Sequence, residues 1–592
     1  MLDLERLVRV PRLDSTSPFG VSPSGQNAVF AWDRSGRWEI YELDLAGRSP
    51  DPQPVSRTPG ASFAPRYSPD GRRLAYAVDL TGGENYHLFV LDRASGETLD
   101  LTPDVPFALQ PDFCWSPDGS QLALLADRDG CFDAYLLPSC GGALTKALAT
   151  GHPCRAAEWS PDGRWLAVEA DGRGLDRLLY LLPLAGGEPR PLGDGINARH
   201  PAWSPDGRRL AFCSDAPGRT QVGVVDPQTG ALAWPACGEG EHERPRWSPD
   251  GRSIVCTCGR GTKTGLSILH LDGEPEYCEV APGVHHHPQY TPDGQRLLFL
   301  FDNAGRPEDL WQLDLVSGAT HPLTHSLPPD LRSQEFCRPQ AITYPGLDGT
   351  PVPALLFRPP QTPASALVVI HGGPDWHYED AWNPFMAHCA SRGWAVLAPN
   401  YRGSTGYGRA WQNASRFDYG GVDTDDCAAG AMYLVRQGLA DPARIAVSGR
   451  SHGGYLTMTC LTRFPELWAA GAAVVPFLNW AASHERSRPD LQHWDIENMG
   501  DPQEHHSRWR EASPFFFLDR VRAPVQLICG ANDPRCPAED SLAARDRLQE
   551  LGKPVELLLY ADEGHVFLKQ ENLLDAEGRR VAFLAQALEE QP

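Results

Sequence analysis

A serine between small residues is the strongest chemical signal in this sequence. Ser451 lies in the segment G-R-S-H-G at 449–453, which matches the pattern G-x-S-x-G. A strand-like apolar run, 445–447, precedes it, and a helix-like run, 455–458, follows it. In this strand–turn–helix context, a serine stands on a sharp turn that lifts its hydroxyl out of the sheet. We therefore predict that Ser451 is a nucleophile rather than an idle turn residue.

A serine hydroxyl is a weak nucleophile and needs a base that a carboxylate orients. On this kind of sheet the chain order is serine, acid, histidine, with the acid after a later strand and the histidine after the last one. Asp533 follows the apolar run 525–529, and His565 follows the run 555–560. These positions predict a catalytic triad of Ser451, Asp533 and His565.

The tetrahedral intermediate of acyl transfer needs hydrogen-bond donors for its oxyanion. The backbone N–H of His452, directly after the candidate nucleophile, is one expected donor. A second is expected from the turn H-G-G-P at 371–374, because it follows the apolar run 367–370. Gly373 is our choice for that donor.

The loop after the next predicted strand is expected to form the substrate pocket. Residues 473–475 are apolar, and 476–480 read P-F-L-N-W. Ligands of doubly wound sheets bind at the carboxyl ends of the strands. Val475, Phe477 and Trp480 are therefore expected to line an apolar pocket that favours Leu, Met or Phe beside the cut bond. Packing in the core explains Phe477 and Trp480 equally well.

Three arginines could recognise the end of a substrate chain. Arg486 and Arg488 follow the pocket loop, and Arg535 lies two residues after Asp533. A planar guanidinium matches a carboxylate with two parallel hydrogen bonds. These residues predict a clamp for a free carboxyl terminus, with carboxypeptidase-like cleavage. The alternative is that Arg486 and Arg488 are solvated loop residues.

The elements that position these residues begin with an internal repeat. Its core is Ser-Pro-Asp-Gly, usually after an aromatic residue, and this composition favours a tight turn between two strands. A second turn, such as D-P-Q-T-G at 226–230, gives each copy two hairpins, as in a four-stranded propeller blade. The copies recur every 43–48 residues and predict seven blades. They begin at Ser22, Ser68, Ser116, Ser160, Ser204, Ser248 and Thr291.

The pattern changes after the last repeat. Residues 328–332 have the composition of a linker, and beyond them apolar runs alternate with helical stretches, as in a parallel sheet with crossover helices. We expect an N-terminal seven-bladed β-propeller over residues 1–330. A C-terminal α/β-hydrolase domain, with a doubly wound and mostly parallel sheet, is expected over residues 331–592.

Composition narrows the classes of function. The chain has 592 residues, of which 41% are apolar and 22% charged, and its formal net charge is −23. These values are ordinary for a globular protein, and so acidic a chain should bind neither nucleic acid nor an anionic membrane. The sequence shows no secretory signal and no apolar run of about 18 residues, so the expected location is the cytoplasm.

Cysteine and histidine spacing predicts no metal site. The 15 cysteines form no paired C-x-x-C units, so free and mostly buried thiols in a reducing compartment are expected. The run 285–287 is H-H-H, but His287 stands before Pro288 as His200 stands before Pro201. This indicates a repeat position of the blade rather than a metal ligand, and no cofactor is expected.

Five further segments carry a family resemblance. They are H-G-G-P at 371–374, N-Y-R-G-S-T-G-Y-G at 400–408, G-R-S-H-G-G-Y at 449–455, D-P-R at 533–535 and D-E-G-H at 562–565. With the repeats, they cover nearly the whole chain and resemble the prolyl oligopeptidase family, within it the acylaminoacyl-peptidase branch. The resemblance implies a propeller over an active site that faces the interdomain cavity, no cofactor, and in some branches an oxyanion donor at the position of Tyr407. The short blades leave no room for the insertion by which dipeptidyl peptidases of the family hold a free amino terminus.

These observations predict a serine peptidase that hydrolyses short peptides or acylpeptides through an acyl-enzyme, with the propeller restricting access. The alternatives are a carboxypeptidase-like exopeptidase with the arginine clamp and a small-molecule esterase on the same fold. A non-catalytic binding module is disfavoured by the complete triad. The expected partner is a short peptide substrate, and the sequence leaves homo-oligomerisation open.

Overall fold

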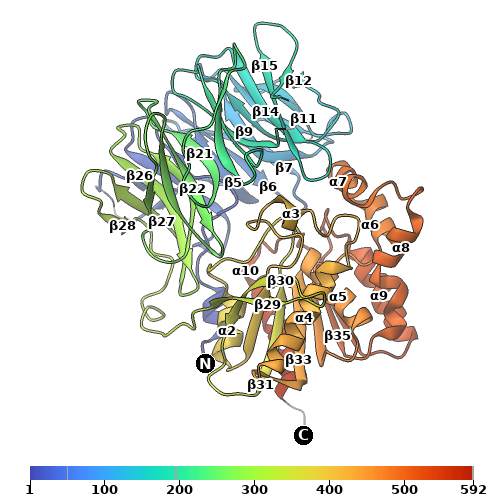
Figure 1. The fold of residues 1–592 in the computed structure, drawn as a ribbon. Helices are drawn as coiled ribbons and strands as arrows, with labels where there is room; N and C mark the ends of the chain where they lie inside the picture. Colours follow the sequence, from blue (N-terminus) through green and yellow to red (C-terminus); the bar gives the residue numbers. More distant parts are fainter. Residues whose placement is uncertain (48, 50, 104, 194–195, 590–592) are drawn as a thin grey trace.

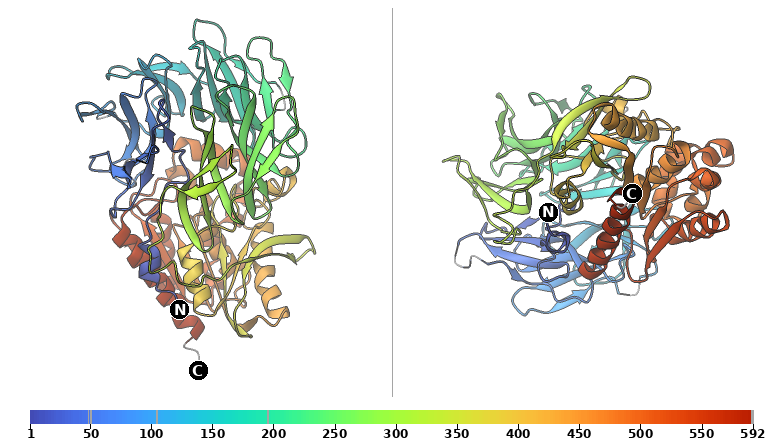
Figure 2. Two further views of the ribbon diagram at one scale, coloured as in Figure 1. Left: turned by 90° about the vertical axis from the view of Figure 1, so that its left-hand side faces the viewer. Right: turned by 90° about the horizontal axis from the view of Figure 1, so that it is seen from below.

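Each of the seven turn repeats builds one four-stranded antiparallel sheet, and the seven sheets form a ring of blades (Figures 1 and 2). This computed structural model describes residues 1–47, 49, 51–103, 105–193 and 196–589. The predicted seven-bladed propeller is confirmed. The strands of the blades, in chain order, are β1 (Gly20–Val21), β2 (Asn27–Trp32), β3 (Glu39–Asp44) and β4 (Gln53–Pro54); β5 (Ala61–Tyr67), β6 (Arg73–Asp79), β7 (Tyr86–Asp92) and β8 (Thr98–Asp100); β9 (Leu109–Trp115), β10 (Gln121–Ala126), β11 (Asp133–Pro138) and β12 (Thr145–Leu148); β13 (Cys154–Trp159), β14 (Trp165–Asp171), β15 (Arg177–Pro183) and β16 (Arg190–Pro191); β17 (Ala198–Trp203), β18 (Leu210–Ser214), β19 (Gln221–Val225) and β20 (Leu232–Ala233); β21 (Glu241–Trp247), β22 (Ser253–Arg260), β23 (Lys263–His270) and β24 (Glu276–Cys278); and β25 (Val284–Tyr290), β26 (Arg296–Asn303), β27 (Arg306–Asp314) and β28 (Thr320–Pro322).

The repeated turn is closed by its own side chains. In the second blade, Ser68 Oγ donates to Asp70 Oδ1 at 2.6 Å and accepts the N–H of Arg73 at 2.9 Å. Gly71 has a φ of +69°, a conformation that favours glycine. The same hydroxyl–aspartate bond closes the turns that begin at Ser116, Ser160, Ser204, Ser248 and Thr291. The repeat is therefore a unit that forms a turn by itself.

The aromatic residue before the turn ties neighbouring blades together. The indole N–H groups of Trp115, Trp203 and Trp247 each donate to a backbone carbonyl of the preceding blade, at 3.1, 3.0 and 3.0 Å. Arg209 of the fifth blade also lies over the ring of Trp247, 4.9 Å from its centroid. Contact between blades explains why the repeat carries an aromatic residue at this position.

The first and last blades meet through side chains, because each blade is built from four consecutive strands. Leu298 and Leu300 of the last blade pack with Phe30 of the first blade. His287 contacts the carbonyl of Ser15 through Nε2 at 2.7 Å. The ring is thus closed without a strand shared between its ends.

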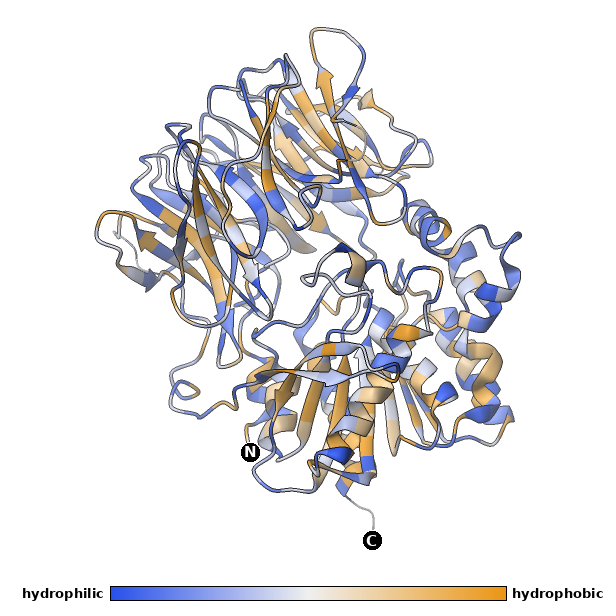
Figure 3. Ribbon diagram, viewed as in Figure 1, coloured by the Kyte–Doolittle hydropathy of each residue, from blue (hydrophilic) through white to orange (hydrophobic). Residues whose placement is uncertain are grey.

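Beyond the propeller, eight strands form one sheet in the order β29-β30-β32-β31-β33-β34-β35-β36. The first two pairings are antiparallel and the remaining ones are parallel. This is the mostly parallel sheet that was predicted, and its strands are largely hydrophobic (Figure 3). The strands are β29 (Gln340–Pro345), β30 (Pro351–Phe357), β31 (Ala364–Ile370), β32 (Ala395–Pro399), β33 (Ala440–Arg450), β34 (Ala470–Val474), β35 (Val525–Gly530) and β36 (Val555–Tyr560).

Helices cover both faces of this sheet. Residues of α4, α5 and α9 share one apolar core with the strands, and residues of α2 and α10 share another. Within the described part of the chain, none of the helices combines the length and apolar character that a membrane crossing requires. The helices are α1 (Leu4–Val8), α2 (Pro384–Ser391), α3 (Arg409–Gln412), α4 (Val422–Arg436), α5 (His452–Arg463), α6 (Trp480–Arg486), α7 (Pro489–Met499), α8 (His506–Ala512), the 3₁₀ helix η1 (Pro514–Arg520), α9 (Ala538–Glu550) and α10 (Gln570–Glu589).

The start of the chain lies on the C-terminal domain, as the position of the N-terminus in Figure 2 shows. Leu2 and Leu7 pack with Ala387 of α2, and Arg9 forms an ion pair with Glu571 at 2.9 Å. A division of the chain at residue 330 stays a prediction. It falls between the end of β28 and the start of β29.

Candidate active site

Ser451 stands on the turn between β33 and α5, with a φ of 58° and a ψ of −122°. Such a conformation costs a non-glycine residue on the order of 1–3 kcal/mol and persists only where the surroundings impose it. Here the N–H of Ser451 donates to the carbonyl of Val474 at 2.9 Å. A Cβ at Gly453 would overlap the carbonyl oxygen of Ile370. The turn has the tight strand–turn–helix geometry of a nucleophile elbow.

His565 and Asp533 follow the last two strands of the sheet and contact each other. His565 Nδ1 lies 2.8 Å from Asp533 Oδ2, and Asp533 Oδ1 accepts the N–H groups of Arg535 and Cys536 at 2.8 and 2.9 Å. Both side chains are almost fully buried. A carboxylate held in this way fixes the orientation of the imidazole and leaves its Nε2 for proton transfer.

The Ser451 hydroxyl lies beside this pair. A carboxylate oxygen of Asp533, the sulfur of Cys536 and an imidazole nitrogen of His565 lie within 4.8 Å of one another. Burial raises the pKa of the Cys536 thiol well above its ordinary value, and an interaction with the Ser451 hydroxyl opposes this shift. Among the contacts of the described residues, Ser451 Oγ makes no hydrogen bond to His565. In substrate-free enzymes such a bond is often long and tightens when substrate binds.

The glycine turn after β31 packs directly on Ser451. A Cβ at Gly372 would lie 2.9 Å from the carbonyl oxygen of Arg450 and 3.2 Å from the Cβ of Ser451. Gly373 has a φ of +115° and lines the same cavity as Ser451. Its N–H and that of His452, the first residue of α5, are thus the candidate donors to an oxyanion.

Ser451 faces a cavity of about 300 Å³ with walls from both domains. Five of the other predicted site residues line this cavity: Gly373, His452, Phe477, Trp480 and Arg535. Phe477 and Trp480 also pack on the core of the C-terminal domain, so the two interpretations of these residues apply together. The remaining lining residues are Arg155 and Arg177 of the propeller and Asp375, Ser483, Ser487, Leu491, Trp494, Asp495 and Cys536.

Val475 and Tyr407 do not line this cavity. Val475 is fully buried and packs with Ile528 and Leu558. The Tyr407 hydroxyl accepts a hydrogen bond from Asn400 Nδ2 at 2.8 Å. Neither side chain is among the residues that line the cavity.

The arginines of the predicted clamp are all bound to carboxylates of the protein. Arg486 lies outside the cavity, 3.4 Å from Asp540. Arg488 lies outside it as well, 3.4 Å from Glu84 and 3.3 Å from Asp490. The structure therefore brings only Arg535 of these three to the cavity.

Two residues at the site were missed from the sequence. The guanidinium of Arg450, directly before Ser451, donates to the backbone carbonyl of His565 and so supports the loop of the base. Glu84 lies on the turn between β6 and β7 of the propeller, with a φ of 54°, and accepts a hydrogen bond from Arg535 Nε at 2.8 Å. No local pattern marks Glu84, because its partner is 451 residues away in the chain.

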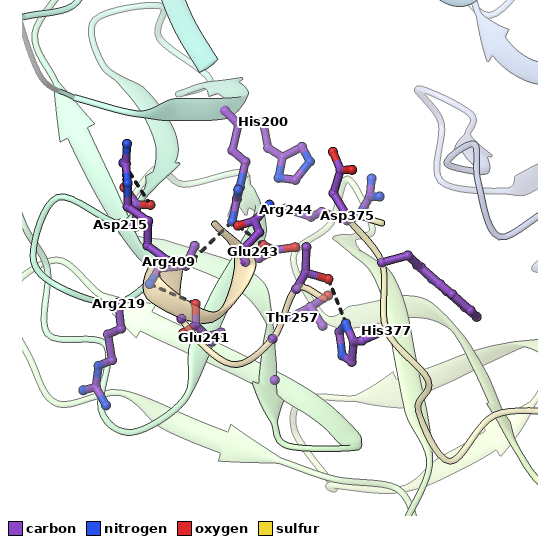
Figure 4. A pocket seen from close by; sticks show the side chains of 18 of the residues that line it. His200, Asp215, Arg219, Glu241, Glu243, Arg244, Thr257, Asp375, His377 and Arg409 are labelled. Atoms are coloured by element: carbon purple, nitrogen blue, oxygen red, sulfur yellow. Dashed lines mark hydrogen bonds and ion pairs between the residues drawn. The ribbon is translucent and has the colours of Figure 1, made fainter. Parts of the chain in front are cut away.

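A second, polar cavity of about 410 Å³ lies between the propeller and the C-terminal domain (Figure 4). Its walls carry charges of both signs, including Glu243, Arg244 and Asp375. It shares Arg155, Arg177 and Asp375 with the cavity at Ser451, so the two adjoin. The interior between the domains is therefore a polar space that leads to the candidate nucleophile.

Among the residues that the structure describes, two groups of side chains have the spacing of metal ligands. One group consists of the candidate acid Asp533, the candidate base His565 and the neighbouring thiol of Cys536. The other is His286, Asp302 and Glu308 of the last blade. Burial raises the pKa of Glu308 above its ordinary value.

His200 and His287 occupy equivalent bulges, with φ values of 56° and 49°. In each case the histidine stands before a proline of the first strand of its blade, β17 or β25. This agrees with a structural repeat position for His287.

Two family models match different parts of the chain. Residues 376–591 match the model of the prolyl oligopeptidase family. The C-terminal part of the chain is thus similar to the prolyl oligopeptidase family. Residues 48–177, 146–278 and 200–335 match the model of the TolB beta propeller domain. The similarity over residues 376–591 supports a serine-type peptidase.

The curated relatives in this family are similar over a limited region. A dipeptidyl peptidase family member 6 of Caenorhabditis elegans is 34% identical over 236 residues, which are 39% of this chain and 32% of that protein. An acylamino-acid-releasing enzyme of Arabidopsis thaliana is 30% identical over 208 residues, which are 34% of this chain and 27% of that protein. The chain thus matches about a third of the length of these relatives.

Solved structures show the same fold over the whole chain. A puromycin-hydrolyzing peptidase of Mycobacterium tuberculosis has a TM-score of 0.86 at 22% identity and covers 100% of this chain and 97% of its own. An acylaminoacyl peptidase of Pyrococcus horikoshii has a TM-score of 0.75 at 19% identity, with coverage of 100% and 98%. The chain therefore shares the propeller-plus-hydrolase fold of these solved structures.

Proposed function

We propose that the protein is a serine peptidase that hydrolyses short peptides or acylpeptides through an acyl-enzyme on Ser451. The observation that carries this proposal is the strained turn at Ser451, which stands beside the buried His565–Asp533 pair. The glycine turn at 371–374 packs on the same serine and supplies a second backbone donor. The nucleophile and the oxyanion donors line one cavity, and Cys536, which lines it as well, lies next to the base and the acid.

The chemistry follows from these positions. Ser451 Oγ attacks the carbonyl carbon of the substrate while its proton passes to His565 Nε2. The N–H groups of His452 and Gly373 bind the oxyanion, a contribution of about 3–4 kcal/mol for one such donor. His565 then gives the proton to the leaving amine, and a water molecule deacylates Ser451 with the same residue as base. Asp533, which contacts His565 Nδ1, orients and stabilises the imidazolium.

The propeller supports selection by size. Arg155 and Arg177 of the fourth blade line the cavity at Ser451, and Arg155 also lies 3.2 Å from Asp490 of α7. A substrate must therefore enter through the space between the domains or after they separate. Short peptides should be cut, and folded proteins should resist, because access depends on such an opening.

The experiment measures hydrolysis of acyl-amino-acid anilides and peptides by the wild type and by Ser451→Ala. Activity should vanish in the variant, and an acyl-aminoalkyl phosphonate should label Ser451 in the wild type. Ser507→Ala, which changes an exposed serine of α8, is the matched control and should leave both results intact. Activity that survives in Ser451→Ala would refute the proposal.

A small-molecule esterase is the second candidate on this fold. An esterase should cut esters far faster than the matching anilides and peptides. Propeller residues line the polar cavity that adjoins the cavity at Ser451, and this favours the peptidase. Equal rates on peptides with and without an acyl group would indicate an oligopeptidase rather than an acylpeptide hydrolase.

A further inference from the structure

The walls of the cavity at Ser451 are aromatic and mutually braced. Phe477 and Trp480 line it at a ring-centroid distance of 4.8 Å, and Trp494 of α7 lines it as well. Tyr419 stacks on both indoles, at 5.8 Å from Trp480 and 5.6 Å from Trp494. Stacked rings hold these walls in place, so the pocket is preformed for a flat side chain.

Most polar groups of this pocket are already bound to the protein. Ser483 Oγ donates to Asp540 Oδ2 at 2.7 Å, and Ser487 Oγ donates to the carbonyl of His484 at 3.2 Å. The two hydroxyls thus have hydrogen-bond partners and do not need one from a ligand.

The arginines that line the cavity are also engaged. Arg155 donates to Asp171 at 2.6 Å, and Arg177 lies 2.6 Å from the same carboxylate. Arg535 is bound to Glu84, as described above. Two carboxylates also line the cavity, Asp375 and Asp495, and Asp495 follows the lining residue Trp494 in α7.

Asp495 lies on the face of α7 that also presents Leu491 and Trp494 to the cavity. Its Oδ2 is 3.0 Å from His484 Nδ1, while its Oδ1 has no hydrogen-bond partner among the described residues. Its side chain keeps 14% of its surface exposed. Burial raises the pKa of Asp495 to about 6, and the bond to His484 opposes the shift. At neutral pH the pocket therefore offers an ionised carboxylate whose Oδ1 accepts no hydrogen bond from the described residues.

We propose that this pocket selects a tyrosine side chain beside the cut bond, with the phenol O–H donating to Asp495 Oδ1. The inference rests on the proposed function of Ser451 and names the substrate class of that site. A phenol ring matches the aromatic walls and carries its donor at the far end from the backbone. A phenylalanine side chain would contact the same aromatic walls, but it would bury the carboxylate without giving it a hydrogen bond. A site built to bind a hydroxyl discriminates strongly against an analogue that lacks it, because its polar group is then left unpaired.

The test compares kcat/KM for acetyl-Tyr, acetyl-Phe, acetyl-Leu and acetyl-Lys anilides in the wild type and in Asp495→Ala. The wild type should prefer Tyr over Phe by about tenfold or more, the usual effect of a hydrogen bond to a charged group. Asp495→Ala should lose this preference while it keeps or improves hydrolysis of the Phe substrate. Glu485→Gln, which alters an exposed carboxylate of the preceding helix α6, is the matched control and should keep the preference.

A parallel measurement separates this inference from the peptidase proposal. The rates at which Tyr and Phe diphenyl phosphonates label Ser451 measure the preference of the pocket for either side chain, even without turnover. Selective labelling by the Tyr reagent without anilide hydrolysis would support the tyrosine pocket and refute the peptidase. The tyrosine pocket is refuted if Phe or Lys matches Tyr in the wild type, if Asp495→Ala slows Tyr and Phe substrates equally, or if neither reagent labels Ser451.

Discussion

Arg535 donates its Nε–H to Glu84 Oε2 at 2.8 Å, so a residue two positions after the candidate acid Asp533 is bonded to a turn of the propeller. Glu84 is also 3.4 Å from Arg488. One propeller carboxylate therefore neutralises two of the three arginines that the sequence offers for a substrate carboxylate. The bond joins the two domains at the wall of the catalytic cavity.

Because Glu84 occupies Arg535, we expect the wild type to cut an acylated peptide and its carboxyl-terminal amide at rates within about threefold. A charged hydrogen bond to the carboxylate would instead give about a 10–150-fold difference. Glu84→Gln should free Arg535 and shift the preference toward the free acid. A tenfold preference for the acid in the wild type would re-establish the carboxypeptidase-like alternative.

The tyrosine preference should depend on pH. The pKa of Asp495 is raised to about 6 by burial, so its carboxylate accepts a hydrogen bond above this pH and becomes protonated as the pH falls through it. The ratio of kcat/KM for Tyr over Phe substrates should be constant above pH 7 and decline below pH of about 6. The ratio removes the pH effects that both substrates share. A ratio that does not change between pH 5 and 8 would contradict this assignment.

Gly453→Ala should abolish activity and destabilise the C-terminal domain. Its Cβ would overlap the carbonyl oxygens of Ile370 and His371, so the turn that carries Ser451 must shift. Overpacking of this kind costs about 1–3 kcal/mol or more of unfolding free energy. Gly578→Ala in α10, where a Cβ meets nothing within 4 Å, is the control and should stabilise by about 0.5–1 kcal/mol. Thermal unfolding and anilide hydrolysis measure both effects.

Ion pairs between the domains should limit access for long substrates. Arg409 of α3 pairs with Asp176 and, at 3.2 Å, with Asp215, both on the propeller. Asp176→Asn should raise kcat/KM for a 30-residue peptide by up to about fivefold, since exposed pairs contribute about 0.2–1 kcal/mol. A dipeptide anilide should be cut at an unchanged rate. Equal acceleration of both substrates would speak against control by domain opening.

The propeller could be predicted from the sequence because each turn repeat closes itself locally, as the Ser68–Asp70 bond illustrates. The elbow at Ser451 could be predicted for the same reason, since its glycines and flanking elements are adjacent in the chain. Asp495 and Glu84 could not, because their importance depends on contacts across the fold. The position of α7 over the cavity brings Asp495 there, and a blade turn carries Glu84 to Arg535. The apolar pocket expected from 473–480 omitted the carboxylate for this reason.

The packing of α1 has a consequence for the order of folding. Leu2 to Arg9 precede the propeller in the chain, yet they find their partners on α2 and on α10, which follow it. The propeller blades can therefore fold while this segment is still unpaired, and the segment can dock only after α2 and α10 have formed.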